Sequence, residues 1–251
     1  MADLAARLAR AGCVAAAEEA AELARAAGGD AALLASLGAR RLTGEPLAWV
    51  TGRTDFGDLC VRVDVGVYVP RWQSLPLARR AARHLPESGA AIDLCTGSGA
   101  IAATLRAARP AARVVATDLD PRAVACARAN GVEAYRGDLF AGVPDALRGE
   151  TDVVVAVVPY VPTDALALLP SDTLRFEDAA HYDGGPEGTD LLRRVVDEAP
   201  RFLHPGGALL LELGGDEAEL VLPALERHGY GSVRTWSDED GDVRGLEAVL
   251  P

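Results

Sequence analysis

Apolar positions follow a helical spacing through the first forty residues. Residues 2–42 are rich in alanine, leucine, arginine and glutamate, are interrupted at Gly12 and Gly28, and contain Asp30, which is placed to cap a further helix. The Thr-Gly-Glu-Pro segment at 43–46 breaks this pattern. These features predict a small N-terminal helical domain over residues 1–43.

The next segment has the alternation of a strand. Apolar residues occupy every second position from Leu59 to Val65, with polar Arg62 and Asp64 between them, which predicts a short β-hairpin. We assign residues 44–73 to a linker that carries this hairpin, and residues 74–251 to a second, larger domain.

Short apolar runs alternate with helical patterns in the larger domain. The runs lie at 90–92, 113–116, 153–158 and 208–213, and the tail at 232–250 can supply a terminal antiparallel pair. Such alternation predicts an α/β fold with parallel strands joined by right-handed helical crossovers. The uninterrupted valine-rich run at 153–158 is typical of a central strand covered on both faces.

Charge and cysteine usage limit the partners that we expect. The chain of 251 residues carries 25 basic groups, all arginine, against 37 acidic ones, for a net charge of −12. This balance disfavours a nucleic-acid partner, which needs a basic face. The four cysteines are scattered and predict neither a metal site nor disulfides, and no apolar run is long enough to span a membrane. We therefore expect a cytoplasmic protein without metal.

A glycine-rich turn follows the first strand of the larger domain and opens a helix. Its residues run from Asp93 through Cys95, Thr96, Gly97 and Ser98 to Gly99. Glycines at such a turn let the backbone approach a ligand closely, and the helix N-terminus offers unpaired N–H groups. A Walker-type phosphate site is excluded because no lysine follows, and the GxGxxG spacing of dinucleotide binders is absent.

Acidic residues follow the next two strands. Asp118 is placed to accept hydrogen bonds from two ribose hydroxyls, and Asp138 is expected near the edge of an adenine. Each could be an ordinary turn carboxylate, but together with the glycine turn they describe a cleft for adenosine attached to an amino acid. The ligand that fits this description is S-adenosylmethionine.

The sequence resembles the HemK/PrmC family of class I methyltransferases, whose members methylate the N5 atom of a protein glutamine. The likeness is collinear through residues 45–52, 69–71, 93–101, 175–177, 183–190 and 210–214. It implies a Rossmann-like fold with a mostly parallel seven-stranded sheet, so that residues 74–251 form the domain that binds S-adenosylmethionine. The cofactor residues that follow from the turn, the acidic positions and the resemblance are Arg71, Asp93, Cys95, Thr96, Gly97, Ser98, Gly99, Asp118, Leu119, Asp138 and Leu139.

Two of these positions depart from the family pattern. Cys95 stands where the family usually has glycine, which is tolerable if its side chain points away from the cofactor. Leu139 stands where a larger aromatic residue usually lies beside the adenine, so that some stacking area is lost.

The active-site motif departs further. The family's Asn-Pro-Pro-Tyr aligns with Val157, Val158, Pro159 and Tyr160, so valine replaces the asparagine. In the family, that side chain and the next backbone carbonyl accept hydrogen bonds from the substrate amide. Valine has no acceptor, although the Val158 carbonyl and the Tyr160 ring remain. The change argues against glutamine methylation more than against catalysis, because an amine, carboxylate or phenolate needs orientation more than activation.

Other residues near the expected substrate side are weaker candidates. His181 is a candidate general base in the long segment after Pro159, with Glu177 and Asp183 as further candidates. Trp72 and Gln73 replace residues of the family motif near the cofactor entrance, and Trp72 is expected to add an aromatic wall.

Three hypotheses for function remain open. The first is an S-adenosylmethionine-dependent methyltransferase whose acceptor is a small metabolite or an unidentified protein side chain, and not a release-factor glutamine. The second is a repurposed enzyme of specialised metabolism that catalyses a non-methyl displacement or a ring closure. The third is a non-catalytic scaffold that binds S-adenosylmethionine. All three leave room for a partner subunit that completes the substrate pocket.

Overall fold

The computed structural model describes residues 2–251, which begin with a bundle of three short helices. Asp30 caps the third helix, because its Oδ1 accepts the N–H groups of Ala32 at 2.8 Å and Leu33 at 3.0 Å. Leu8 and Leu23 are fully buried between the helices. The helices are α1 (Ala2–Arg10), α2 (Ala16–Ala27) and α3 (Ala31–Arg41).

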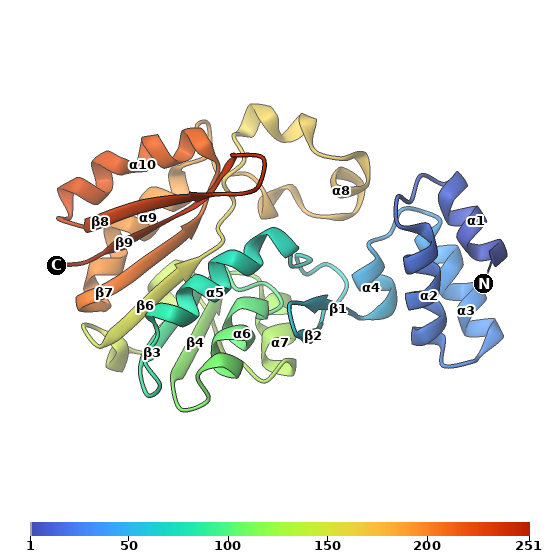
Figure 1. Ribbon diagram of the computed structural model, residues 1–251, viewed down its shortest axis with the longest axis horizontal. Helices are drawn as coiled ribbons and strands as arrows, with labels where there is room; N and C mark the ends of the chain where they lie inside the picture. Colours follow the sequence, from blue (N-terminus) through green and yellow to red (C-terminus); the bar gives the residue numbers. More distant parts are fainter. Residues whose placement is uncertain (1) are drawn as a thin grey trace.

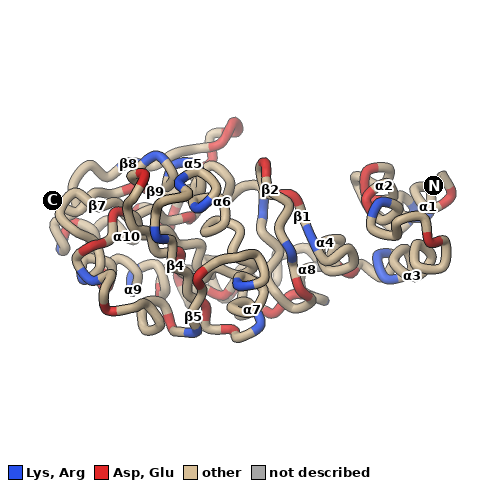
Figure 2. The backbone as a smooth tube through the Cα atoms, turned by 90° about the horizontal axis from the view of Figure 1, so that it is seen from below, with Lys and Arg blue, Asp and Glu red and all other residues tan. Residues whose placement is uncertain are grey.

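A linker separates this bundle from the sheet (Figure 2). It contains α4 (Leu47–Thr51) and the antiparallel hairpin of β1 (Arg53–Phe56) and β2 (Leu59–Arg62). The indole N–H of Trp49 donates to the carbonyl of Val67 at 2.8 Å. This buried bond ties α4 to the chain that enters the larger domain.

The larger domain is built on a seven-stranded sheet in the order β5-β4-β3-β6-β7-β9-β8. The strands β3 to β7 are parallel, and β9 runs antiparallel to both β7 and β8. The predicted α/β class and the terminal antiparallel pair are therefore confirmed. The bounds are β3 (Ala90–Leu94), β4 (Arg113–Asp118), β5 (Glu133–Arg136), β6 (Thr151–Ala156), β7 (Leu203–Glu212), β8 (Gly231–Ser237) and β9 (Val243–Val249).

One predicted strand is shorter than expected. The apolar run at 153–158 was expected to be all strand, but β6 ends at Ala156. Val157 and Val158 begin the connection that leaves the carboxyl edge of the sheet, and apolar character alone cannot mark that departure. The two valines therefore stand at the place where parallel α/β sheets bind ligands.

Helices cover both faces of the sheet (Figure 1). Alternate strand residues face two separate apolar clusters, with Val153, Val155 and Leu210 on one side and Val154 and Leu211 on the other. The first side is covered by α5 (Leu75–His84), α6 (Ala100–Ala108) and α7 (Pro121–Ala129), and the second by α9 (Asp190–Glu198) and α10 (Gly215–Arg227). No helix in the described part of the chain is long and apolar enough to cross a bilayer.

A long connection between β6 and α9, residues 159–188, is here called the cover segment. It contains α8 (Ser171–Phe176) and two 3-10 turns, Thr163–Leu168 and Ala179–His181. Near its ends Val161 pairs with Asp183 in a parallel bridge. At Gly188, with φ of +70°, a Cβ would lie 2.3 Å from the Tyr160 carbonyl oxygen, so only glycine fits there. This close packing holds Tyr160 at the sheet edge.

Candidate functional site

A cavity of about 810 Å³ opens at the carboxyl edge of the sheet. This size suits a small-molecule site. Its walls come from the turns after β3, β4 and β6, from the end of β7 and from the cover segment. The lining residues that the sequence predicted are Arg71, Gln73, Cys95, Gly97, Asp118, Leu119, Asp138, Leu139, Val157, Val158, Pro159, Tyr160 and His181.

The glycine turn is held from beneath by Asp93. This carboxylate is buried, and its Oδ2 accepts the Thr96 hydroxyl at 2.6 Å and the Ala102 N–H at 3.1 Å. Gly99 has φ of +82°, and a Cβ there would lie 3.0 Å from that of Ala127. Four predicted cofactor residues, Asp93, Thr96, Ser98 and Gly99, do not line the cavity. The structure uses Asp93 and Thr96 to shape the turn.

Asp93 should make stability depend on pH. Burial raises the pKa of its carboxyl to about 7, against which the hydrogen bonds from Thr96 and Ala102 act. The unfolded group has a pKa of about 4. Between these values the folded state keeps the proton while the unfolded state loses it. The contribution of the protonated Asp93 to the free energy of unfolding is therefore complete below about pH 4 and is lost as the pH rises through about 7.

When the pH rises from 4.5 to 7.5, we expect the free energy of unfolding to fall less for the Asp93→Asn variant than for the parent. The difference between the two losses should be on the order of a few kcal/mol. Thermal melting of both proteins at the two pH values measures this difference. Equal losses in parent and variant would mean that Asp93 does not titrate in this range.

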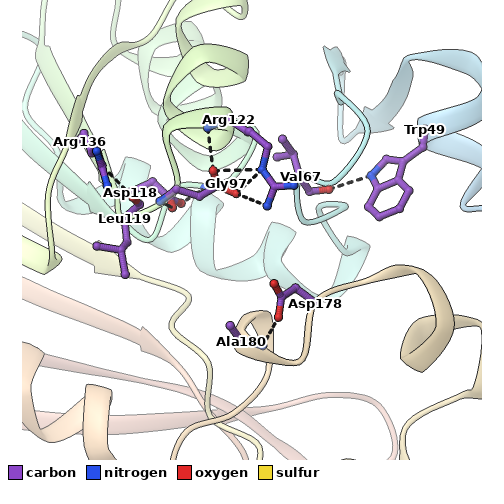
Figure 3. Close-up of polar contacts among 10 residues, drawn as sticks. Trp49, Val67, Gly97, Asp118, Leu119, Arg122, Arg136, Asp178 and Ala180 are labelled. Atoms are coloured by element: carbon purple, nitrogen blue, oxygen red, sulfur yellow. Dashed lines mark hydrogen bonds and ion pairs between the residues drawn. The ribbon is translucent and has the colours of Figure 1, made fainter.

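Asp118 lies at the end of β4 and lines the cavity. Its Oδ2 accepts the Gly97 N–H at 2.8 Å and its Oδ1 accepts the Asp120 N–H at 2.9 Å. Burial raises the pKa of Asp118, and the two backbone bonds act against that rise. Figure 3 shows Asp118 beside Gly97, with Asp178 and Ala180 of the cover segment facing them. Each carboxylate oxygen keeps capacity for a further hydrogen bond, as a ribose diol requires.

The expected adenine end is formed by Leu119, Asp138 and Leu139. Leu119 is 64% exposed and Leu139 is buried, while Asp138 is ion-paired with Arg194 at 3.0 Å. Cys95, a predicted cofactor residue, lines the cavity and has φ of +54°, in the region that favours glycine. The residue packs against the apolar cluster on the second face of the sheet, and burial raises the pKa of its thiol.

The opposite end of the cavity is formed by Val157, Val158, Pro159, Tyr160 and Glu212. The Tyr160 hydroxyl donates to Glu212 Oε1 at 3.3 Å. Burial raises the pKa of both groups. Val157 presents only methyl groups at the position of the family's asparagine, so this wall is apolar beside a buried carboxylate.

Arg71 connects the linker to the cover segment. It lines the cavity, but its Nη2 donates to Glu177 Oε1 at 2.5 Å and to the Tyr182 hydroxyl at 2.8 Å. The Tyr182 hydroxyl also contacts Glu177 Oε2 at 2.8 Å, and the guanidinium carbon of Arg71 lies 5.2 Å from the Tyr68 ring centroid. Glu177 does not line this cavity, so the structure uses it as the counter-ion of Arg71 and not as a base.

The remaining substrate-side candidates fall in different places. His181 lines the cavity, where its ring packs edge-on against that of Tyr68. Asp183 does not line the cavity and accepts the Thr163 hydroxyl at 2.7 Å. The expected aromatic wall at Trp72 is wrong, because this side chain is 75% exposed and lies outside the cavity. Neighbouring Gln73 does line it.

Sequence reasoning missed Tyr68 and the site role of Glu212. The ring of Tyr68 packs edge-on against His181 and Tyr182, with centroids 6.1 Å and 5.7 Å apart, and no local pattern marks it. Glu212 did leave a signal, because it is the one charged residue in the apolar run at 208–213. No cluster of three potential metal ligands occurs among the described side chains.

The cavity fits S-adenosylmethionine in size and chemistry, and comparison with known proteins agrees. Residues 77–159 match the family model described as the methyltransferase small domain. A release factor glutamine methyltransferase from Geobacter sulfurreducens is 35% identical over 81% of this chain and 72% of its own. One from Salmonella typhimurium is 36% identical over 84% and 78%. A methyltransferase structure from Pyrococcus furiosus shares the fold, with a TM-score of 0.52, 20% identity, and coverage of 84% of this chain and 96% of its own.

Proposed function

The chain belongs to the HemK/PrmC family of S-adenosylmethionine-dependent methyltransferases, and from this premise we propose that its acceptor is not a release-factor glutamine. The relatives bear the name of release factor glutamine methyltransferases. The acceptor proposed for this chain is a more nucleophilic group, carried by a small molecule or by another protein side chain.

Val157 is the observation that supports this proposal. An amide nitrogen is a poor nucleophile because its lone pair is delocalised into the carbonyl group, so it needs hydrogen-bond acceptors that aim the lone pair. Val157 lines the cavity and offers none. Losing one polar group that acts at the transition state typically costs about 10²–10³ in rate. A nucleophile with a localised lone pair avoids most of this cost.

The rest of the cavity is suited to methyl transfer. Bound S-adenosylmethionine supplies an electrophilic methyl carbon. Asp118 and the glycine turn would hold its ribose and amino-acid parts, while the Val158 carbonyl and the Tyr160 ring would orient the acceptor. Orientation of two bound reactants can supply several kcal/mol of the barrier reduction.

The test is methyl transfer to a release-factor peptide that carries the unmodified target glutamine. With methyl-labelled S-adenosylmethionine, we expect the parent protein to give no N5-methylglutamine above the enzyme-free background. The Salmonella typhimurium relative serves as the positive control. Methylation of the peptide by the parent at a rate near that of the control would refute the proposal.

A further inference from the structure

Glu212 lies beside Val157 at the edge of the sheet. β6 and β7 are parallel, with Val155 opposite Leu210 and Ala156 opposite Leu211. β6 ends at Ala156, and continuing its register by one residue sets Val157 opposite Glu212, with both side chains on the same face. Both residues line the cavity. The carboxylate therefore stands next to the position where the family's asparagine would be.

The carboxylate of Glu212 is only partly satisfied. Glu212 is 7% exposed, and the Tyr160 hydroxyl donates to its Oε1 at 3.3 Å. Oε2 makes no hydrogen bond of ordinary geometry to a described residue, although the Ser74 hydroxyl interacts with the carboxylate and opposes the rise in its pKa that burial causes. A buried oxygen without a full set of partners is unfavourable, and more so when it is charged. The geometry thus offers one strong acceptor position to whatever enters this end.

The nearby cations are already paired with other acids. Among the arginines that line the cavity, Arg71 contacts Glu177, Arg122 contacts Asp120 at 2.7 Å, and Arg244 contacts Asp238 at 2.6 Å. Glu212 forms no ion pair with any described residue, although the charge of Arg244 acts on it from a distance and opposes the rise in its pKa that burial causes.

The negative charge of Glu212, which no nearby cation pairs with, would favour some classes of acceptor over others. A positively charged or N–H-bearing group would gain a charge-assisted hydrogen bond at Oε2. A carboxylate acceptor would face the like charge of Glu212, which is unfavourable. An alcohol could donate only one hydrogen bond and would bring no charge.

We propose that Glu212 binds the acceptor nitrogen and that the acceptor of this enzyme is a basic amine. The inference rests on the proposed function, because it names the class of nucleophile that replaces the glutamine amide. Glu212 is then a catalytic residue in contact with the reacting nitrogen.

The chemical step balances with the groups present. A bound ammonium gives one proton to Glu212 Oε2, and the freed lone pair of the neutral amine attacks the methyl carbon in line with sulfur. The new C–N bond forms as the C–S bond breaks, and its electron pair stays on sulfur as S-adenosylhomocysteine. The positive charge of the sulfonium passes to the methylated ammonium. Burial, which raises the pKa of Glu212, brings its proton affinity closer to that of the amine.

The test compares three probes of similar shape: benzylamine, benzyl alcohol and phenylacetate. Each is titrated into protein saturated with S-adenosylhomocysteine, with binding followed by ligand-observed NMR. We expect benzylamine to bind about ten- to hundredfold more tightly than the other two. The Glu212→Gln variant, which keeps shape and removes charge, should lose this preference. Glu219→Gln, an exposed residue of α10, is the matched control and should keep it.

Methyl transfer to the same probes separates the two proposals. We expect labelled methyl groups on benzylamine with the parent and the control, and at least tenfold less with Glu212→Gln at unchanged S-adenosylhomocysteine affinity. The inference on Glu212 is overturned if the parent binds the alcohol or the carboxylate as tightly as the amine, or if Glu212→Gln keeps the preference. Glutamine methylation by the parent would instead overturn the proposed function, whatever the behaviour of Glu212→Gln.

Discussion

Replacing Asp118 with alanine should weaken S-adenosylmethionine binding about a hundredfold or more. Its two oxygens are placed to accept both ribose hydroxyls, and each charge-assisted bond contributes about 1–3 kcal/mol. The substitution would also release the N–H groups of Gly97 and Asp120, which Asp118 accepts at 2.8 Å and 2.9 Å. Both effects act in the same direction. Titration calorimetry on parent and variant at one pH measures the sum.

The control for this experiment is Glu133→Ala. Glu133 is an acid on neighbouring β5, but it is paired with Arg113 at 2.8 Å and does not line the cavity. Surface pairs of this kind contribute little to stability, so its removal should leave cofactor affinity unchanged. If Asp118→Ala bound S-adenosylmethionine as tightly as Glu133→Ala, the cofactor would not occupy this cavity in the orientation described.

Restoring asparagine at position 157 should produce a gain of activity. In the Val157→Asn variant, the new amide oxygen would face the acceptor end of the cavity, and methyl transfer to the glutamine peptide should rise from the enzyme-free background to a measurable rate, because one such polar group contributes about 10²–10³ in rate. Cofactor affinity should stay the same, because Val157 lies at the opposite end of the cavity from Leu119 and Leu139. Mass spectrometry of the peptide detects the added methyl group.

A matched valine controls for nonspecific effects. Val65 lies in the loop after β2, is 59% exposed, and lies outside the cavity, so Val65→Asn should behave as the parent does. If folded Val157→Asn gave no methylglutamine, the cover segment or the helical domain would decide the acceptor instead of this residue.

Local sequence predicted where the glycine turn and the strand-end acids lie, but not which of them line the cavity. A strand end, a glycine turn and a helix start lie within ten residues, so the turn at 93–99 could be recognised without tertiary information. The position of Asp118 follows from the same reasoning, because carboxyl ends of parallel strands share one edge of the sheet. The role of Asp93 could not be separated from that of Asp118, since both are strand-end acids and only packing buries one of them.

The parts that depend on long-range packing were not predicted. Arg71 and Glu177 are 106 residues apart in sequence, and their bond exists only because the cover segment folds back over the linker. Trp72 looked like a cavity wall, but the 3-10 turn Trp72–Ser74 directs its side chain outward, while Gln73 lines the cavity. The position of Glu212 near Val157 depends on the register of β6 and β7, which a single sequence does not reveal.

One measurement tests the central claim most directly, namely the fate of the methyl group when two acceptors compete. The parent protein is supplied with methyl-labelled S-adenosylmethionine, the release-factor glutamine peptide and benzylamine together, and S-adenosylhomocysteine and both methylated products are counted by mass spectrometry. The account predicts one S-adenosylhomocysteine for each methylated amine and an unmodified peptide. Methylated peptide in amounts that match the S-adenosylhomocysteine formed would contradict it.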